Sequence, residues 1–407
     1  YTYSSESEDE NNDYATSRQS GDSRNREHVW DAEYIHVLTL HWSHRLGDKT
    51  KLSAGYELEH LHAEQNFHVS DLVGTEYVDN ADQSSDFTHM RLINSLYATA
   101  EAQLGMWKLL GGLRGEYVSQ ENRFISDGTS ASQHYASVYP TLHATYAVDR
   151  HNELMLSYSL RVNRPEGSDM NPFPERINPL SMQAGNPDLK PEKIHSIEAG
   201  WQWRKDEMTL LGTLYYRYLT NRITEVSRYI ENGVLLTTKE NMNSSQSAGA
   251  EVIFDGSVAR WLSFNCNING FFNQIDASDL GYGRQRNAFS WSARINANFT
   301  PLRHWLIQLN ARFRSSSLVP QGRRDADSRV NLGMKYDLPK YNLALTASVT
   351  DVFDTYRRSY TLDTPELKQH VVSRRNPRIF SFGLTWRFGG KAPGKKTNDE
   401  LQYDEGF

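Results

Sequence analysis

The 407-residue sequence lacks long hydrophobic runs, and its only cysteine is Cys266. A membrane-spanning helix needs about 20 consecutive apolar residues. No stretch of the sequence has that character, so a helical membrane protein is excluded. A single cysteine rules out an internal disulfide. Because Cys266 falls among the apolar residues of a predicted strand, we interpret it as a small packing residue rather than a reactive thiol.

Motifs for catalysis and for nucleotide, metal or nucleic-acid binding are also missing. The sequence contains no phosphate-binding loop, no G-x-G-x-x-G, no C-x-x-C and neither of the hydrolase signatures G-x-S-x-G and H-E-x-x-H. His60 and His62 share one face of a strand but lack a third ligand. The net charge of -6 gives no basic surface for nucleic acid. We therefore predict no catalytic residue, no cofactor and no metal site.

The residues from Ala288 to Phe313 alternate between apolar and polar side chains. Period two indicates strands, because successive side chains point to opposite faces. One face is apolar and bounded by aromatic residues, and the other carries arginine and asparagine. This combination is typical of a transmembrane β-barrel, whereas strands of soluble proteins usually run about five or six residues. The apolar face holds Phe289, Trp291, Ala293, Ile295, Ala297, Phe299, Trp305, Ile307, Leu309, Ala311 and Phe313.

The fold class predicted is therefore all-β, an antiparallel transmembrane barrel. About fifteen strands of roughly 10 to 18 residues follow from the same periodicity. Their predicted spans are 30–46, 50–66, 86–104, 107–123, 134–148, 152–163, 193–204, 207–226, 242–257, 260–274, 285–300, 304–318, 328–338, 341–354 and 376–388.

Short and long connections alternate along the chain, as in outer-membrane barrels with short periplasmic turns and longer external loops. This assigns residues 30–388 to the barrel portion and residues 389–407 to a periplasmic tail. The first predicted strand runs inward, so residues 1–29 are expected to be an external loop, with Tyr1–Tyr3 the remnant of a preceding strand. The sequence has no starting methionine and no signal peptide, so we expect the beginning of an exported protein to have been lost.

A group of proline motifs follows the strand 152–163. Pro187 and Pro191 fix φ and cannot donate ladder hydrogen bonds, and Gly185 can adopt positive φ at a turn. We therefore favour a structural role over direct ligand contact. The group consists of Arg164-Pro165, Asn171-Pro172-Phe173 and Gly185-Asn186-Pro187-Asp188-Leu189-Lys190-Pro191-Glu192.

This group resembles the corresponding segment of TonB-dependent outer-membrane receptors, specifically the receptor-type barrel family of Bacteroidota. Weaker matches are Gly112–Tyr117, Tyr139-Pro140, Val349–Asp354 and Phe382–Phe388. The resemblance covers roughly residues 30–390 and implies the C-terminal part, about 15 to 16 strands, of a 22-stranded barrel. It also implies a plug domain that is not present in this chain, and a location in the cell outer membrane.

Four partners follow from the resemblance. They are outer-membrane lipid, TonB acting through a missing N-terminal region, a surface lipoprotein, and a scarce nutrient such as a metal chelate, glycan or peptide. Two non-catalytic alternatives stay open, a non-transporting barrel scaffold in an envelope complex and a passive porin. An outer-membrane enzyme is disfavoured because no nucleophile motif is present. A plug encoded upstream would argue against both the scaffold and the porin.

Arginines on the inward faces are the polar residues with the best case for binding a solute. Arginine recognises carboxylate and phosphate through two parallel hydrogen bonds. The alternative, which we favour, is that these arginines pair with wall carboxylates such as Glu116 or with plug residues. The candidates are Arg161, Arg294, Arg312 and Arg314.

Overall fold

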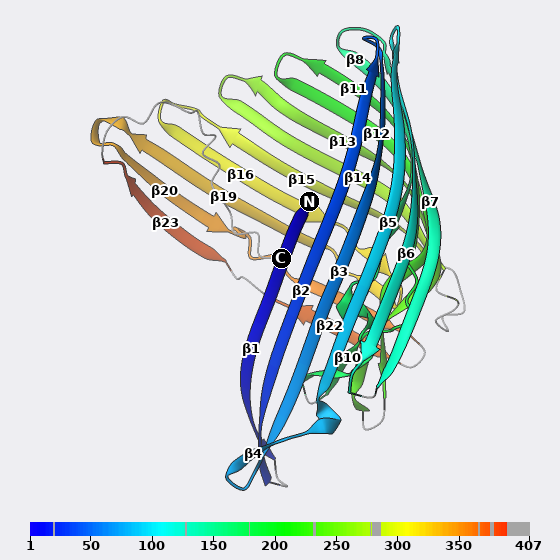
Figure 1. Ribbon diagram of the computed structural model, residues 1–407. Helices are drawn as coiled ribbons and strands as arrows, with labels where there is room; N and C mark the ends of the chain where they lie inside the picture. Colours follow the sequence, from blue (N-terminus) through cyan, green and yellow to red (C-terminus); the bar gives the residue numbers. More distant parts are fainter. Residues whose placement is uncertain are drawn as a thin grey trace. The chain divides into compact units, whose positions relative to one another are not determined.

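Long antiparallel strands make up almost all of the computed structural model (Figure 1). The structure describes residues 1–18, 21–126, 128–178, 180–230, 233–276, 278, 286–364, 367–374 and 378–388. Within these residues the strands form one sheet of 19 strands and a second sheet of four. No helix in the described ranges is long and apolar enough to cross a membrane.

Sixteen strands of eight residues or more occur in the described part of the chain, and they include all fifteen predicted strands. The structure thus confirms the predicted all-β, antiparallel class. Their bounds are β1 (Thr2–Arg18), β2 (Gly21–Leu46), β3 (Thr50–Val73), β5 (Ser85–Leu104), β6 (Trp107–Phe124), β7 (Thr129–Ala147), β8 (Asn152–Asn163), β11 (Glu192–Lys205), β12 (Met208–Tyr229), β13 (Leu235–Ala259), β14 (Leu262–Asp276), β15 (Arg286–Phe299), β16 (Trp305–Arg314), β19 (Asp327–Leu338), β20 (Leu343–Thr350) and β23 (Ile379–Trp386).

The expectation of a loop over residues 1–29 is wrong. Thr2–Arg18 form β1, which pairs along its whole length with β2, from Thr2 opposite Val37 to Arg18 opposite Gly21. The acidic, serine-rich sequence of β1 has no apolar alternation, because both faces of this strand are polar. Backbone pairing with β2 holds it extended nevertheless. Thr2 and Tyr3 do lie in a strand that precedes the first predicted strand and pairs with it, but this strand continues to Arg18. The predicted tail 389–407 lies outside the described residues.

The chain forms two compact units, each built by pairing strands that are neighbours in sequence. Unit 1 comprises Tyr1–Ala144, Ser157–His195 and Leu219–Asn243, and unit 2 comprises Thr145–Leu156, Ser196–Tyr218 and Ser244–Phe407. In unit 1 the ladder runs β1, β2, β3, β5, β6. In unit 2 it runs from β13 through β14, β15, β16, β19 and β20 to β23.

The apolar faces of both units are exposed. Leu96 is 68% exposed in unit 1, and Phe289 and Phe382 are 65% and 84% exposed in unit 2. Several exposed aromatics lie beside short turns, such as Trp107 at the start of β6 and Trp261 just before β14. Aromatic residues at the ends of an apolar band are the pattern expected of a membrane-facing surface.

Two of the predicted long connections fold into the separate four-stranded sheet. Its strands are β17 (Ser317–Val319), β18 (Gly322–Arg324), β21 (Arg358–Asp363) and β22 (Lys368–Ser373). Gln321 and Leu362 are buried in it. A Cβ on Gly322 would lie 1.8 Å from the carbonyl oxygen of Thr361, so only glycine fits the packing of β18 against β21.

The alternation of turn lengths predicts the orientation in the membrane, and impermeant maleimide labelling of intact cells checks it. In a Cys266→Ala background, a cysteine at Lys368, whose side chain is 82% exposed, should react. A cysteine at Asp48, in the exposed turn between β2 and β3, should react only after the outer membrane is permeabilised. The opposite pattern would reverse the assignment of the two sides.

Candidate functional site

Residues 164–192, which contain the proline motifs, lie against the polar face of unit 1. Arg164 forms an ion pair with Glu116 on β6. Glu116 also accepts a 2.6 Å contact from Arg114, and Arg114 reaches Glu57 on β3 at 2.7 Å. The Glu116 side chain is only 6% exposed. Burial lowers the pKa of Arg164, but Glu116 and the neighbouring Tyr135 and Tyr139 together raise it by more, so the pKa lies above its ordinary value and Arg164 stays charged.

A small core fills the space between this segment and the wall. α1 (Gly167–Met170) inserts Met170, which is fully buried, against the amides of Gln120 and Asn122. Asn122 in turn bonds the buried His89 at 2.7 Å. The ring of Phe173 lies 6.2 Å from that of Phe67 on β3. This core is not evident from the sequence, because inward residues of a barrel wall are expected to be wet rather than packed.

Gly185 is required for close backbone approach rather than for a turn with positive φ. Its N–H donates to the carbonyl of Asn171 at 2.6 Å, and the Asn186 N–H donates to that of Asp169 at 2.7 Å. A Cβ on Gly185 would lie 2.5 Å from the Asp169 oxygen. Gly185 is not among the glycines with positive φ, so the turn predicted for it is wrong although its structural importance is supported.

The rest of the G-N-P-D-L-K-P-E motif joins neighbouring strands. Gln133 of β7 donates to the carbonyls of Pro187 and Leu189 at 3.1 and 3.5 Å, and Leu189 is fully buried. The Lys190 N–H donates to Asn241 of β13 at 2.7 Å. Glu192 accepts the N–H of Ile223 on β12 at 3.2 Å. These contacts support a structural role for the motif, which we retain as a proposal.

A polar cavity of about 250 Å³ lies between the segment and strands β2 and β3. Asp169 in its wall forms an ion pair with Lys239. Within the described residues, no group of three histidine, cysteine, aspartate or glutamate side chains is placed to hold a metal ion. The lining includes Asp31, Gln65, Asn66, Phe67, Glu166, Ser168, Asp169, Asn171, Phe173, Glu175 and Lys239.

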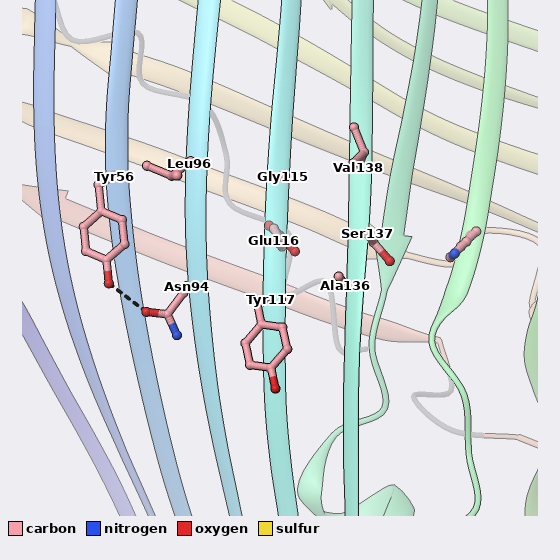
Figure 2. Close-up of a pocket in the computed structure, with 10 residues that line it drawn as sticks. Tyr56, Asn94, Leu96, Gly115, Glu116, Tyr117, Ala136, Ser137 and Val138 are labelled. Atoms are coloured by element: carbon pink, nitrogen blue, oxygen red, sulfur yellow. Dashed lines mark hydrogen bonds between the residues drawn. The ribbon is translucent and has the colours of Figure 1, made fainter.

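A second, more open depression of about 620 Å³ in unit 1 lies around Gly115 (Figure 2). Leu96, Tyr117 and Val138 around it are each more than half exposed, and Tyr56 donates to Asn94 at 2.7 Å. These residues belong to the apolar face, so the depression is suited to lipid chains rather than to a polar solute.

The four predicted arginines occupy different parts of the fold. Arg161 is exposed on β8 in unit 1. In unit 2, Arg294 of β15 lies directly opposite Arg312 of β16, and Arg314 lies opposite Asp327 of β19. Glu116, which we expected to pair with these four arginines, forms ion pairs with Arg114 and Arg164 instead. The prediction that the four pair with Glu116 is wrong.

Arg329 of β19, which was not predicted, lies opposite Arg312. Its alternation with the apolar residues Val330, Leu332 and Met334 could have identified it, because that period places Arg329 on the polar face.

Comparison with known protein families identifies the family to which this chain belongs. The model of the outer membrane protein beta-barrel family matches residues 1–386. The chain belongs to this family. Its location is the outer membrane, as predicted. No curated protein sequence matches the chain.

Solved structures of barrels with the same fold have low sequence identity to this member of the family. The copper transporter OprC has a TM-score of 0.62 and 14% identity, covering 89% of this chain and 57% of its own. The ferric yersiniabactin uptake receptor FyuA from Yersinia pestis has a TM-score of 0.60 and 14% identity, covering 89% and 56%. The ferric-catecholate import receptor Fiu from E. coli K12 has a TM-score of 0.60 and 13% identity, covering 94% and 60%. The chain thus spans little more than half the length of these proteins.

Proposed function

We propose that the protein is the barrel portion of a TonB-dependent outer-membrane receptor that imports a scarce nutrient. The observation that carries the proposal is the match of about nine-tenths of the chain to barrels whose names describe a copper transporter and two import receptors. The R-P, N-P-F and G-N-P-x-L-K-P-E motifs add support, because they occur together in one segment that lies against the wall. The role is non-catalytic.

Import of this kind requires a plug and a TonB-binding segment in addition to the 407 residues. In the proposed receptor, the wall and residues 164–192 form the static part of the solute path, and the plug supplies the moving part. The ion pairs of Glu116 and the packed Met170 hold the segment in place while a solute passes. The nutrient classes compatible with the proposal are metal chelates, glycans and peptides.

Nutrient uptake after deletion of the gene tests the proposal. We expect uptake of one of the three nutrient classes to be lost in the deletion strain, restored by the intact gene, and abolished equally by loss of TonB or by an uncoupler. Uptake that continues in uncoupled cells would indicate a passive porin. Normal uptake of every class, with the protein isolated in a stable envelope complex, would indicate a scaffold.

A further inference from the structure

Three arginines form a row across neighbouring strands on the polar face of unit 2. Arg294 of β15 lies opposite Arg312 of β16, and Arg312 lies opposite Arg329 of β19. These strands lie side by side in Figure 1. Side chains directly opposite each other have Cβ atoms about 4.5–5.5 Å apart, and like charges at such positions are destabilising. A bound anion would therefore relieve the repulsion within a row of three cations.

The described residues do not supply that anion. Among them, no carboxylate forms an ion pair with Arg294, Arg312 or Arg329. The carboxylates nearest in register are engaged elsewhere, since Asp327 contacts Arg324 at 3.5 Å and Glu251 accepts from Asn267 at 2.8 Å.

Arg329 shows the lack of a carboxylate among the described residues most directly. Its guanidinium lies 5.3 Å from the ring centre of Tyr356, and its Nε atom is buried and makes no hydrogen bond with the residues that the structure describes. Other arginines on polar faces are paired, such as Arg114 with Glu57 and Glu116, and Arg217 with Glu198. Arg294, Arg312 and Arg329 differ from Arg114 and Arg217 because no described carboxylate forms an ion pair with them.

A ladder of amides lies beside the row and keeps the strands in register. Asn310 donates to Asn296, Asn331 donates to Asn310 at 3.4 Å, and the Asp351 N–H donates to Asn331 at 2.9 Å. The asparagine side chains are neutral, and the Asp351 carboxylate accepts from the N–H groups of Thr355 and Tyr356. The backbone spacing of the row is therefore fixed without any contribution from its charges.

We propose that Arg294, Arg312 and Arg329 bind an anionic solute that carries at least two carboxylate or phosphate groups. Neighbouring strands are about 4.7–4.9 Å apart, so the row spans roughly 10 Å. Guanidinium groups bind both kinds of anion through paired hydrogen bonds. The inference rests on the proposed import function and restricts its nutrient to an anion, such as an acidic chelate, an acidic glycan or an acidic peptide.

Arginine modification of the intact receptor, purified in detergent from outer membranes, tests this directly. Phenylglyoxal should modify Arg294 and Arg312, as mapped by mass spectrometry. Citrate, pyrophosphate or both should slow that modification, while sucrose should not. Protection by citrate alone indicates a carboxylate ligand, and protection by pyrophosphate alone indicates a phosphate. Arg217 is the internal control, because its ion pair with Glu198 is independent of added anion.

The variant Arg312→Gln separates binding from a structural role. It should abolish protection of Arg294 and leave the unfolding temperature unchanged or higher, because it removes like-charge repulsion. Arg217→Gln should leave protection intact. The proposal is overturned if neither anion protects the row, if Arg312→Gln lowers the unfolding temperature, or if the three arginines react only after denaturation because protein carboxylates already occupy them. This experiment measures anion binding and not transport. A negative result would therefore overturn the anion site without deciding the outcome of the uptake experiment.

Discussion

Replacing Glu116 with glutamine is expected to release residues 164–192 from the wall of unit 1. Glu116 is the shared partner of Arg114 and Arg164, and its side chain is almost fully buried. Removing one member of a buried ion pair leaves the other charge, here that of Arg164, uncompensated, at a cost of about 3–5 kcal/mol, whereas Arg114 keeps Glu57. The variant can avoid this cost by detaching the segment, so its loss of stability cannot exceed the free energy of detachment. We therefore expect the segment to detach while the barrel stays folded.

Limited trypsin digestion of the purified protein measures this release. In Glu116→Gln, cleavage after Arg176 should become fast, while the heat-modifiable mobility of the barrel is retained. Glu121→Gln on the same strand is the matched control, because Glu121 pairs only with the exposed Arg123 among the contacts described for it. Equal digestion of the two variants would show that Glu116 does not hold the segment.

Replacing Ile295 with arginine is expected to destabilise the barrel strongly. Ile295 lies on the apolar face of β15, between Cys266 and Ala311 on the adjacent strands. An arginine that faces lipid near the midplane costs roughly 2–4 kcal/mol. The neighbouring Asn296 belongs to the polar face, where an arginine should cost only the ladder hydrogen bond to Asn310, about 1 kcal/mol.

Guanidinium titration in lipid vesicles, followed by tryptophan fluorescence, gives the free energy of unfolding for both variants. The difference between Ile295→Arg and Asn296→Arg is the informative quantity, because both add the same side chain to adjacent positions. If the two variants lose the same stability, the assignment of the two faces is wrong.

The alternation of apolar and polar residues predicted the barrel strands well, because every second side chain of such a strand faces an apolar medium. Residues Phe289–Phe299 show this alternation clearly, and they form β15 as expected. The same rule failed for β1, where acidic and serine residues occupy both faces. A strand with water on both sides keeps its backbone pairing but loses its sequence pattern.

The sequence predicted which residues form the candidate site, but it did not predict which residues they contact. The prolines marked residues 164–192 as a special connection. However, the burial of Met170 and the approach of Gly185 to Asp169 depend on which wall residues meet the segment. Partner choice was equally hidden, because Glu116 could have paired with several arginines and bonds Arg114 and Arg164. Such pairings join positions that are far apart in sequence.

The length of the strands has a consequence for where a solute is first held. A tilted strand needs about 9–11 residues to cross the hydrocarbon, but β2 has 26 residues and β3 has 24. About 15 residues of β2 therefore extend past the hydrocarbon, a height of roughly 35 Å for a tilt of about 45°. Phe67 and His89, which contact residues 164–192, belong to the parts of β3 and β5 far from the short turns. With the predicted orientation, the part of the segment beside Phe67 and His89 would lie above the lipid surface on the external side, while Arg164 lies lower, beside Glu116.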